Sequence, residues 1–65
     1  MEQVYRQIEG KLELVGELDN SCDWGTLWRF RSRRTNLIYV LGHTTREKAI
    51  KRAIRLDEQI KKDSH

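Results

Sequence analysis

The stretch Trp24–Arg34, with the sequence WGTLWRFRSRR, most limits the folds open to this chain of 65 residues. Successive side chains of a β-strand point to opposite faces of a sheet, so an alternating sequence marks a strand with two different faces. This stretch alternates large aromatic residues with arginines: Trp28 and Phe30 against Arg29, Arg31 and Arg33. It predicts a half-buried strand with one aromatic face and one cationic face, a shape suited to holding a polyanion.

The length permits one small domain, residues 1–65, and a domain of this size buries only about 60% of the surface of its unfolded chain. The single Cys22 excludes an internal disulfide framework, and no Cys and His spacing indicates a zinc site. We therefore expect no metal and no cofactor. No apolar run is long enough for a membrane span or a signal peptide, so we expect a cytoplasmic protein, nucleoid-associated if bacterial or phage.

The charge is divided unevenly along the chain. Residues 1–27 carry a net charge of −4 and residues 28–65 a net charge of +7. This asymmetry indicates either an anionic partner for the second half, most commonly nucleic acid, or internal pairing of the two halves.

Residues 1–10 are ambiguous. Val4, Tyr5 and Ile8 fit one face of a helix, while Val4 and Ile8 also fit a period of two. Gly10 suits the end of a short helix and, with Glu9, the tight turn of a hairpin. The pattern slightly favours an extended N-terminal arm.

A sheet is expected over residues 11–41. Residues 11–18 alternate, with Leu12, Leu14 and Leu18 on one side and Glu13, Val15 and Glu17 on the other. Residues 19–23 have the composition of a loop, residues 34–36 form a short connection, and residues 37–41 are rich in strand formers. Three antiparallel strands are predicted.

The hydrophobic period changes from 2 to 3.6 at Gly42, which predicts a helix over residues 44–62. Thr44 is the expected N-cap, with Glu47 three residues later. The helix carries an apolar stripe, formed by Ala49, Ile50, Ala53, Ile54, Leu56 and Ile60. We expect this stripe to cover the sheet over Trp28, Phe30, Ile38 and Val40. The fold class is therefore α+β: a three-stranded antiparallel sheet packed on one C-terminal amphipathic helix, with an N-terminal arm.

Residues in this layout resemble a known family. They are Trp24-Gly25, Trp28, Arg31, Tyr39-Val40-Leu41-Gly42, Thr45, Glu47, Ala49 and Ala53. The pattern is similar to the AP2-like DNA-binding fold of plant AP2/ERF transcription factors and of the arm-binding N-terminal domains of phage and transposon tyrosine integrases. The resemblance covers about forty residues, 24–62; the spacing from Gly42 to Thr45 is shorter than in the plant domains, and no recombinase region follows.

The resemblance implies that the open face of the sheet lies in the major groove of duplex DNA, where Arg29, Arg31 and Arg33 reach bases or phosphates. Arginine suits this role because its planar guanidinium can donate two parallel hydrogen bonds. Arg34 and Tyr39 are further candidates for the same surface. In the alternative interpretation, Glu13 and Glu17 pair with these arginines across the sheet.

The helix adds four basic residues, Lys48, Lys51, Arg52 and Arg55, as candidate phosphate contacts without sequence information. A solvated helix face is the simpler interpretation, and the sequence favours it.

Catalysis is not expected. His43 and Cys22 have no sequence neighbours that would form a nucleophile–base pair or a metal shell, and the carboxylates show no acid–base pattern. We expect neither an enzyme nor a small-molecule substrate.

Two functions therefore follow from the sequence. The first is a small DNA-binding protein of a phage or mobile element, acting in transcription regulation or as an accessory in DNA recombination, alone or as a homodimer. The alternative is a protein-interaction module, antitoxin-like or a phage-encoded regulator, in which the acidic first half engages a basic partner or a sheet edge accepts a strand.

Overall fold

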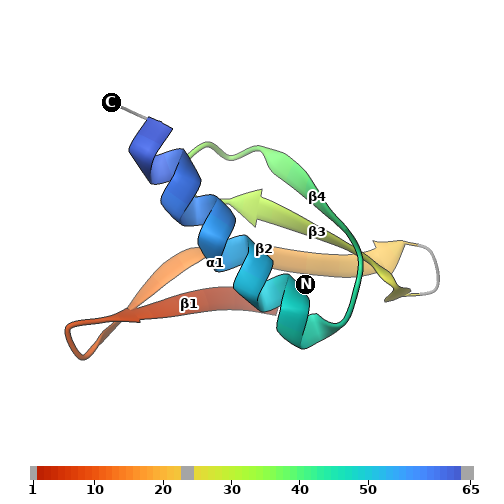
Figure 1. The fold of residues 1–65 in the computed structure, drawn as a ribbon, viewed down its shortest axis with the longest axis horizontal. Helices are drawn as coiled ribbons and strands as arrows, with labels where there is room; N and C mark the ends of the chain where they lie inside the picture. Colours follow the sequence, from red (N-terminus) through yellow and green to blue (C-terminus); the bar gives the residue numbers. More distant parts are fainter. Residues whose placement is uncertain (1, 23–24, 64–65) are drawn as a thin grey trace.

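The computed structural model describes residues 2–22 and 25–63, with the backbone alone for Ser21 and Cys22. Its elements are β1 (Glu2–Ile8), β2 (Lys11–Cys22), β3 (Leu27–Ser32), β4 (Ile38–His43) and α1 (Arg46–Asp63). The four strands form one antiparallel sheet in the order β1-β2-β3-β4, and α1 lies across one face (Figure 1). The expected α+β class, an antiparallel sheet packed on one C-terminal helix, is confirmed.

The prediction of three strands was wrong, because residues 2–8 form β1 and pair with β2 along their whole length. Glu9 and Gly10 connect the two strands, both with positive φ (50° and 77°), as a tight hairpin turn with the twist of its strands requires. The predicted loop at residues 19–23 was also placed too early, since β2 continues to Cys22. Trp24, which contributes to the family resemblance, lies outside the described residues.

A β-bulge in β2 changes which side chains face the helix. The register shifts between Val4 and Tyr5, so that β2 holds one extra residue at Val15. Val15 and Leu18 are both buried in the core, whereas Leu12 is 72% exposed. Strict alternation would place Leu12 with Leu18 on one face; the extra residue moves it to the other.

The register of β4 also differs from the prediction. Phe30 pairs with Tyr39 and Arg31 pairs with Ile38. Tyr39 therefore lies beneath the helix, while Ile38 and Val40, which were expected there, are 52% and 67% exposed on the opposite face. The loop before β4 sets this register: it includes Asn36 at φ 58°, and Ser32 N donates to Leu37 O at 3.0 Å.

The core lies between α1 and the covered face of the sheet. Its buried apolar members are Val4, Val15, Leu18, Trp28, Phe30, Ala49 and Ala53. The two alanines let the helix approach the sheet closely, and Ile50, Ile54 and Leu56 of the expected helix stripe pack against the core beside them. The Trp28 indole is satisfied within the protein, because its Nε1 donates to Thr44 O at 3.0 Å.

The helix cap is one residue later than predicted. α1 begins at Arg46, and Lys48 N donates to Thr45 Oγ1 at 3.4 Å. Thr45, not Thr44, therefore occupies the N-cap position.

Candidate nucleic-acid interface

Arg29 on the open sheet face already has a carboxylate partner. It lies opposite Asp19 in the pairing of β2 with β3, and its Nη2 is 2.5 Å from Asp19 Oδ2. Both side chains are about two-thirds to three-quarters buried, with 32% and 26% exposed. Arg29 therefore carries little uncompensated charge.

Arg31 and Arg33 remain available. Arg31 is exposed and lies opposite Glu17 in register, but its side chain makes no hydrogen bond or ion pair within the described part of the chain. Arg33 follows β3 in an exposed turn. Its backbone is held by a hydrogen bond, in which its N donates to Val15 O at 3.1 Å. On the open face beside β3, Arg31 and Arg33 thus form no ion pair with a described residue, and Glu17 is the carboxylate opposite Arg31.

Arg34 and Tyr39, the other two candidates, do not belong to this face. The Tyr39 ring packs on the core side, and its hydroxyl is 2.9 Å from Thr35 Oγ1. The Arg34 guanidinium reaches the helix, where its Nε donates to Asp57 Oδ1 at 2.9 Å. The placement of both residues with the arginine face is corrected.

The carboxylate of Asp57 is the centre of a buried ionic cluster that sequence reasoning missed. Its side chain is fully buried, with Arg34 Nε at 2.9 Å and Arg6 Nη2 at 3.5 Å. Glu13 joins the cluster through Arg34 at 3.3 Å and Arg6 at 3.6 Å. Glu13 therefore neutralises arginines on the helix side, and the carboxylates opposite the sheet arginines are Asp19 at Arg29 and Glu17 at Arg31. A signal was present: Asp57 follows Ala49 and Ala53 at helical spacing, where an apolar residue is expected.

The strongest uncompensated charge lies on α1. Lys48, Lys51, Arg52 and Arg55 are spaced i, i+3, i+4 and i+7, which places them on one flank of the helix. We call this set the cationic stripe. All four residues are exposed and together line a shallow hollow of about 420 Å³.

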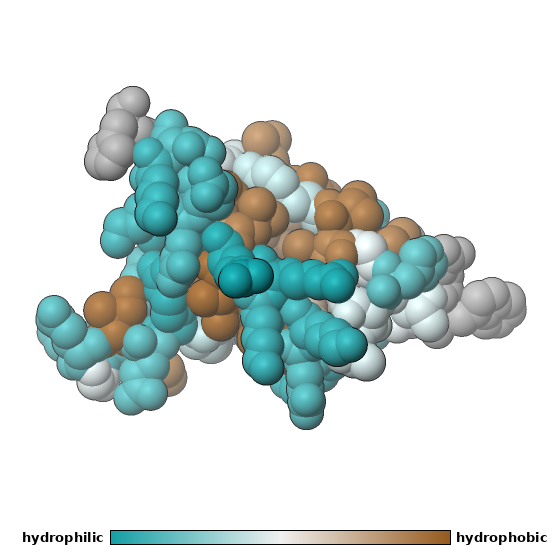
Figure 2. Space-filling model, in the orientation of Figure 1, coloured by the Kyte–Doolittle hydropathy of each residue, from teal (hydrophilic) through white to brown (hydrophobic). Residues whose placement is uncertain are grey.

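No described carboxylate forms an ion pair with the cationic stripe. Among the described contacts, its side chains make one hydrogen bond, from Arg52 Nη1 to the carbonyl oxygen of Leu41 at 2.9 Å. That bond holds the stripe beside β4. In Figure 2, hydrophilic side chains over α1 adjoin hydrophobic ones gathered along β4.

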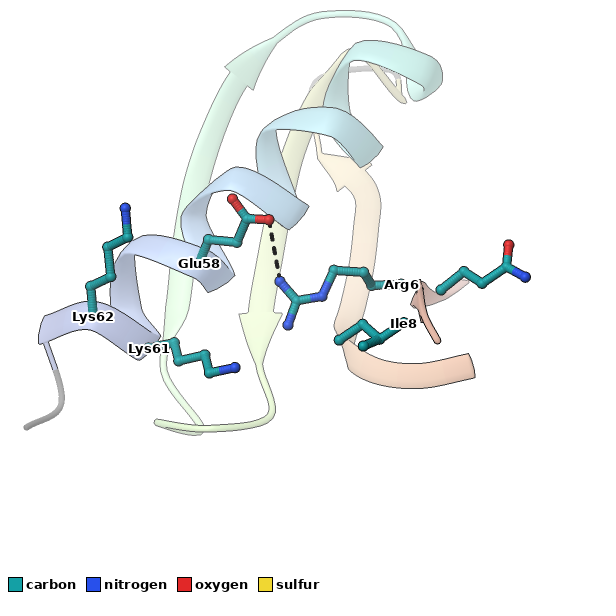
Figure 3. A pocket seen from close by; sticks show the side chains of 6 residues that line it. Arg6, Ile8, Glu58, Lys61 and Lys62 are labelled. Atoms are coloured by element: carbon teal, nitrogen blue, oxygen red, sulfur yellow. Dashed lines mark hydrogen bonds and ion pairs between the residues drawn. The ribbon is translucent and has the colours of Figure 1, made fainter. Parts of the chain in front are cut away.

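A further hollow lies between the end of β1 and the end of α1. It has a volume of about 590 Å³ and is lined by charged and apolar residues: Arg6, Gln7, Ile8, Glu58, Lys61 and Lys62. Figure 3 shows Glu58 projecting from α1 toward Arg6 of β1, and the two form an ion pair at 3.4 Å. Glu58 is the carboxylate among the described lining residues, and Arg6 engages it.

A second ionic contact joins the starts of β1 and α1. Arg46 donates from Nε and Nη2 to the Glu2 carboxylate, at 2.9 and 2.6 Å. These hydrogen bonds lower the pKa of Glu2 and raise the pKa of Arg46. The contact anchors the N-terminal strand to the helix.

Other reactive groups are dispersed. His43 Nδ1 is 3.1 Å from Thr26 Oγ1. The side chain of Cys22 lies outside the described residues. Within residues 2–22 and 25–63, no group of three His, Cys, Asp or Glu side chains could hold a metal ion. The described helix is too polar to cross a membrane.

Comparison with known proteins gives no relative. The chain matches no protein-family model, no curated protein and no solved structure at a significant level. The likeness to AP2-like domains therefore rests on the residue pattern alone.

Proposed function

We propose that this chain is a small DNA-binding protein that contacts the phosphate backbone of duplex DNA through the cationic stripe of α1. The observation that carries the proposal is the set of four exposed basic residues on one helix flank, with no described carboxylate paired to them. A helix flank of this kind can follow a row of phosphates, and each neutralised phosphate releases counterions.

This proposal moves the interface from the sheet to the helix. On the open sheet face, Arg31 and Arg33 form no ion pair with a described residue, while Glu17 opposes Arg31 and Asp19 holds Arg29. The stripe carries four cations that form no ion pair with a described carboxylate, against two on the sheet face, so its electrostatic attraction for DNA is stronger.

Contacts from lysine and arginine to phosphate give affinity without sequence information. We therefore assign the protein an accessory or regulatory role within a larger nucleoprotein assembly, in which another component selects the DNA site.

A titration of fluorescein-labelled duplex DNA, followed by anisotropy at two salt concentrations, tests the proposal. Four phosphate contacts predict that affinity falls roughly 100-fold between about 50 mM and about 200 mM salt. An absence of binding at the lower concentration would sink the proposal.

A further inference from the structure

We propose that the free edge of β4 accepts an extended segment of a second protein as an additional strand, and that this segment alternates apolar with acidic residues. The inference goes beyond DNA binding. It rests on three features of β4: a free backbone edge, exposed apolar side chains, and the cationic stripe beside them.

The backbone of β4 has unused hydrogen-bonding groups. β4 is last in the sheet order, so no described strand pairs with its outer side. Ser32 N donates inward to Leu37 O, and residues of an antiparallel strand alternate between inward and outward bonding. Ile38 and Val40 therefore direct their N–H and C=O groups away from β3, ready to pair with another strand.

The side chains at the same two positions favour an apolar partner. Ile38 is 52% exposed and Val40 is 67% exposed, and Leu37 just before them is 58% exposed. β4 carries no acidic residue, lysine or arginine that would repel an incoming strand. The register of β4 shifts at Leu41, after these two positions, so Ile38 and Val40 lie in the regular part of the strand. A regular edge without charge is the type that accepts strands.

The positive charge of the cationic stripe, on the helix side of the sheet, favours acidic residues in the partner. Arg52 Nη1 donates to Leu41 O in β4, so the cationic stripe begins directly beside this edge on the helix side. Strands lie about 4.8 Å apart, which brings alternate side chains of an added strand within reach of the stripe. Apolar residues would then pack beside Ile38 and Val40, while acidic residues would meet Arg52 and its neighbours.

Other occupants fit less well. A second copy joined through β4 by a two-fold axis would bring two cationic stripes to the same side of the sheet, where they repel each other. Nucleic acid has no backbone that can extend a β-ladder. The opposite edge, β1, carries two charged residues, Glu2 and Arg6, and charged side chains on an edge strand discourage strand addition.

The test uses a fluorescein-labelled peptide of alternating valine and glutamate, with a valine–lysine peptide as its control. We expect the glutamate peptide to bind and the lysine peptide not to bind. In amide hydrogen exchange, Ile38 and Val40 should become protected by at least about ten-fold when the peptide is present.

Two variants at one position sharpen the test. Val40→Pro removes the outward N–H without removing an inward ladder bond, and should weaken peptide binding by about ten-fold or more. Val40→Thr keeps the N–H and a similar shape, so its binding should stay within about two-fold of the original. Circular dichroism confirms that each variant is folded, and the exchange measurement requires no variant.

Several results would overturn the inference. These are absence of binding, binding without protection of the Ile38 and Val40 amides, and equal binding by Val40→Pro. If the Ile38 and Val40 amides are protected in the protein alone and its measured mass is that of a dimer, a second copy of the chain occupies the β4 edge, and the inference is overturned. The Val40→Pro variant keeps the cationic stripe, so we expect it to bind DNA with unchanged affinity. A loss of peptide binding with DNA binding retained therefore concerns the β4 edge alone, and a loss of DNA binding concerns the proposed function.

Discussion

Gly16 shows how one residue makes the bulged sheet possible. A methyl group at this position would lie against the carbonyl oxygen of Arg31 and 2.5 Å from Cε1 of Phe30. Phe30 is fully buried, and neither a backbone carbonyl nor a core ring can move aside at small cost. The close approach of β2 to β3 therefore depends on the absence of a side chain.

Replacing Gly16 with alanine should lower the free energy of unfolding by about 3 kcal/mol, because the methyl group overpacks the core and displaces the β3 backbone. Urea denaturation followed by Trp fluorescence measures the change. Gly10→Ala is the control: it meets no atom within 4 Å and carries only the strain of its φ of 77°. A loss at Gly16 no greater than at Gly10 would contradict the packing argument.

Asp57 is a second single residue on which stability depends, in this case through its charge. Asp57→Ala should cost about 3 kcal/mol, because it leaves the guanidinium groups of Arg6 and Arg34 partly buried without their common partner. Glu58→Ala removes another carboxylate near Arg6, but that side chain is 56% exposed and should cost less than about 1 kcal/mol. Thermal unfolding of the two variants provides the comparison, and equal losses would show that burial of Asp57 does not determine its contribution.

Among the elements, α1 and β3 could be predicted from the sequence because each keeps one period throughout. The aromatic residues of β3 face the core and the arginines face outward, as the alternation required. β2 and β4 could not be assigned to faces, since the bulge at Val15 and the loop that contains Asn36 each set the register by local geometry. A shift of one residue reverses every later side chain, which is why Tyr39 and Val40 exchanged faces.

The start of α1 provides an element-scale prediction. Thr45→Ala should destabilise the protein by about 0.5–1 kcal/mol, because it removes the acceptor for Lys48 N at 3.4 Å. Thr44→Ala should have almost no effect, as the described bonds of Thr44 are made by its backbone. Chemical denaturation of both variants decides which threonine caps the helix; a larger loss at Thr44 would restore the sequence-based assignment.

Across the whole molecule, the two oppositely charged halves are partly paired with each other. Contacts between them include Asp19 with Arg29, Glu13 with Arg34 and Glu2 with Arg46. The described residues of the acidic half thus neutralise cations on the sheet and at the helix start, and none of them forms an ion pair with the cationic stripe. Internal pairing, one of the two alternatives that the sequence presented, therefore accounts for part of the charge asymmetry, and the proposed anionic partner concerns the cationic stripe.

The contact between Glu2 and Arg46 predicts a pH dependence. The folded protein lowers the pKa of Glu2 below 4.5, so the stabilisation is present above that pH and is lost as the pH falls through the folded pKa. Glu2→Gln should therefore be less stable than the original chain at about pH 7, and the difference should shrink toward about pH 3. Urea unfolding at both pH values measures it; a difference that stays constant would contradict the assignment.

The central claim, that DNA lies on the helix and not on the sheet, is tested by two double variants that remove equal charge. Lys51→Gln with Arg55→Gln alters the cationic stripe, and Arg31→Gln with Arg33→Gln alters the sheet face. Anisotropy titrations with the same duplex at several salt concentrations compare them. We predict that the stripe variant binds at least about ten-fold more weakly and loses about two from its salt slope, while the sheet variant binds almost as the original chain does. The opposite ranking would contradict the account and return the interface to the arginine face of the sheet.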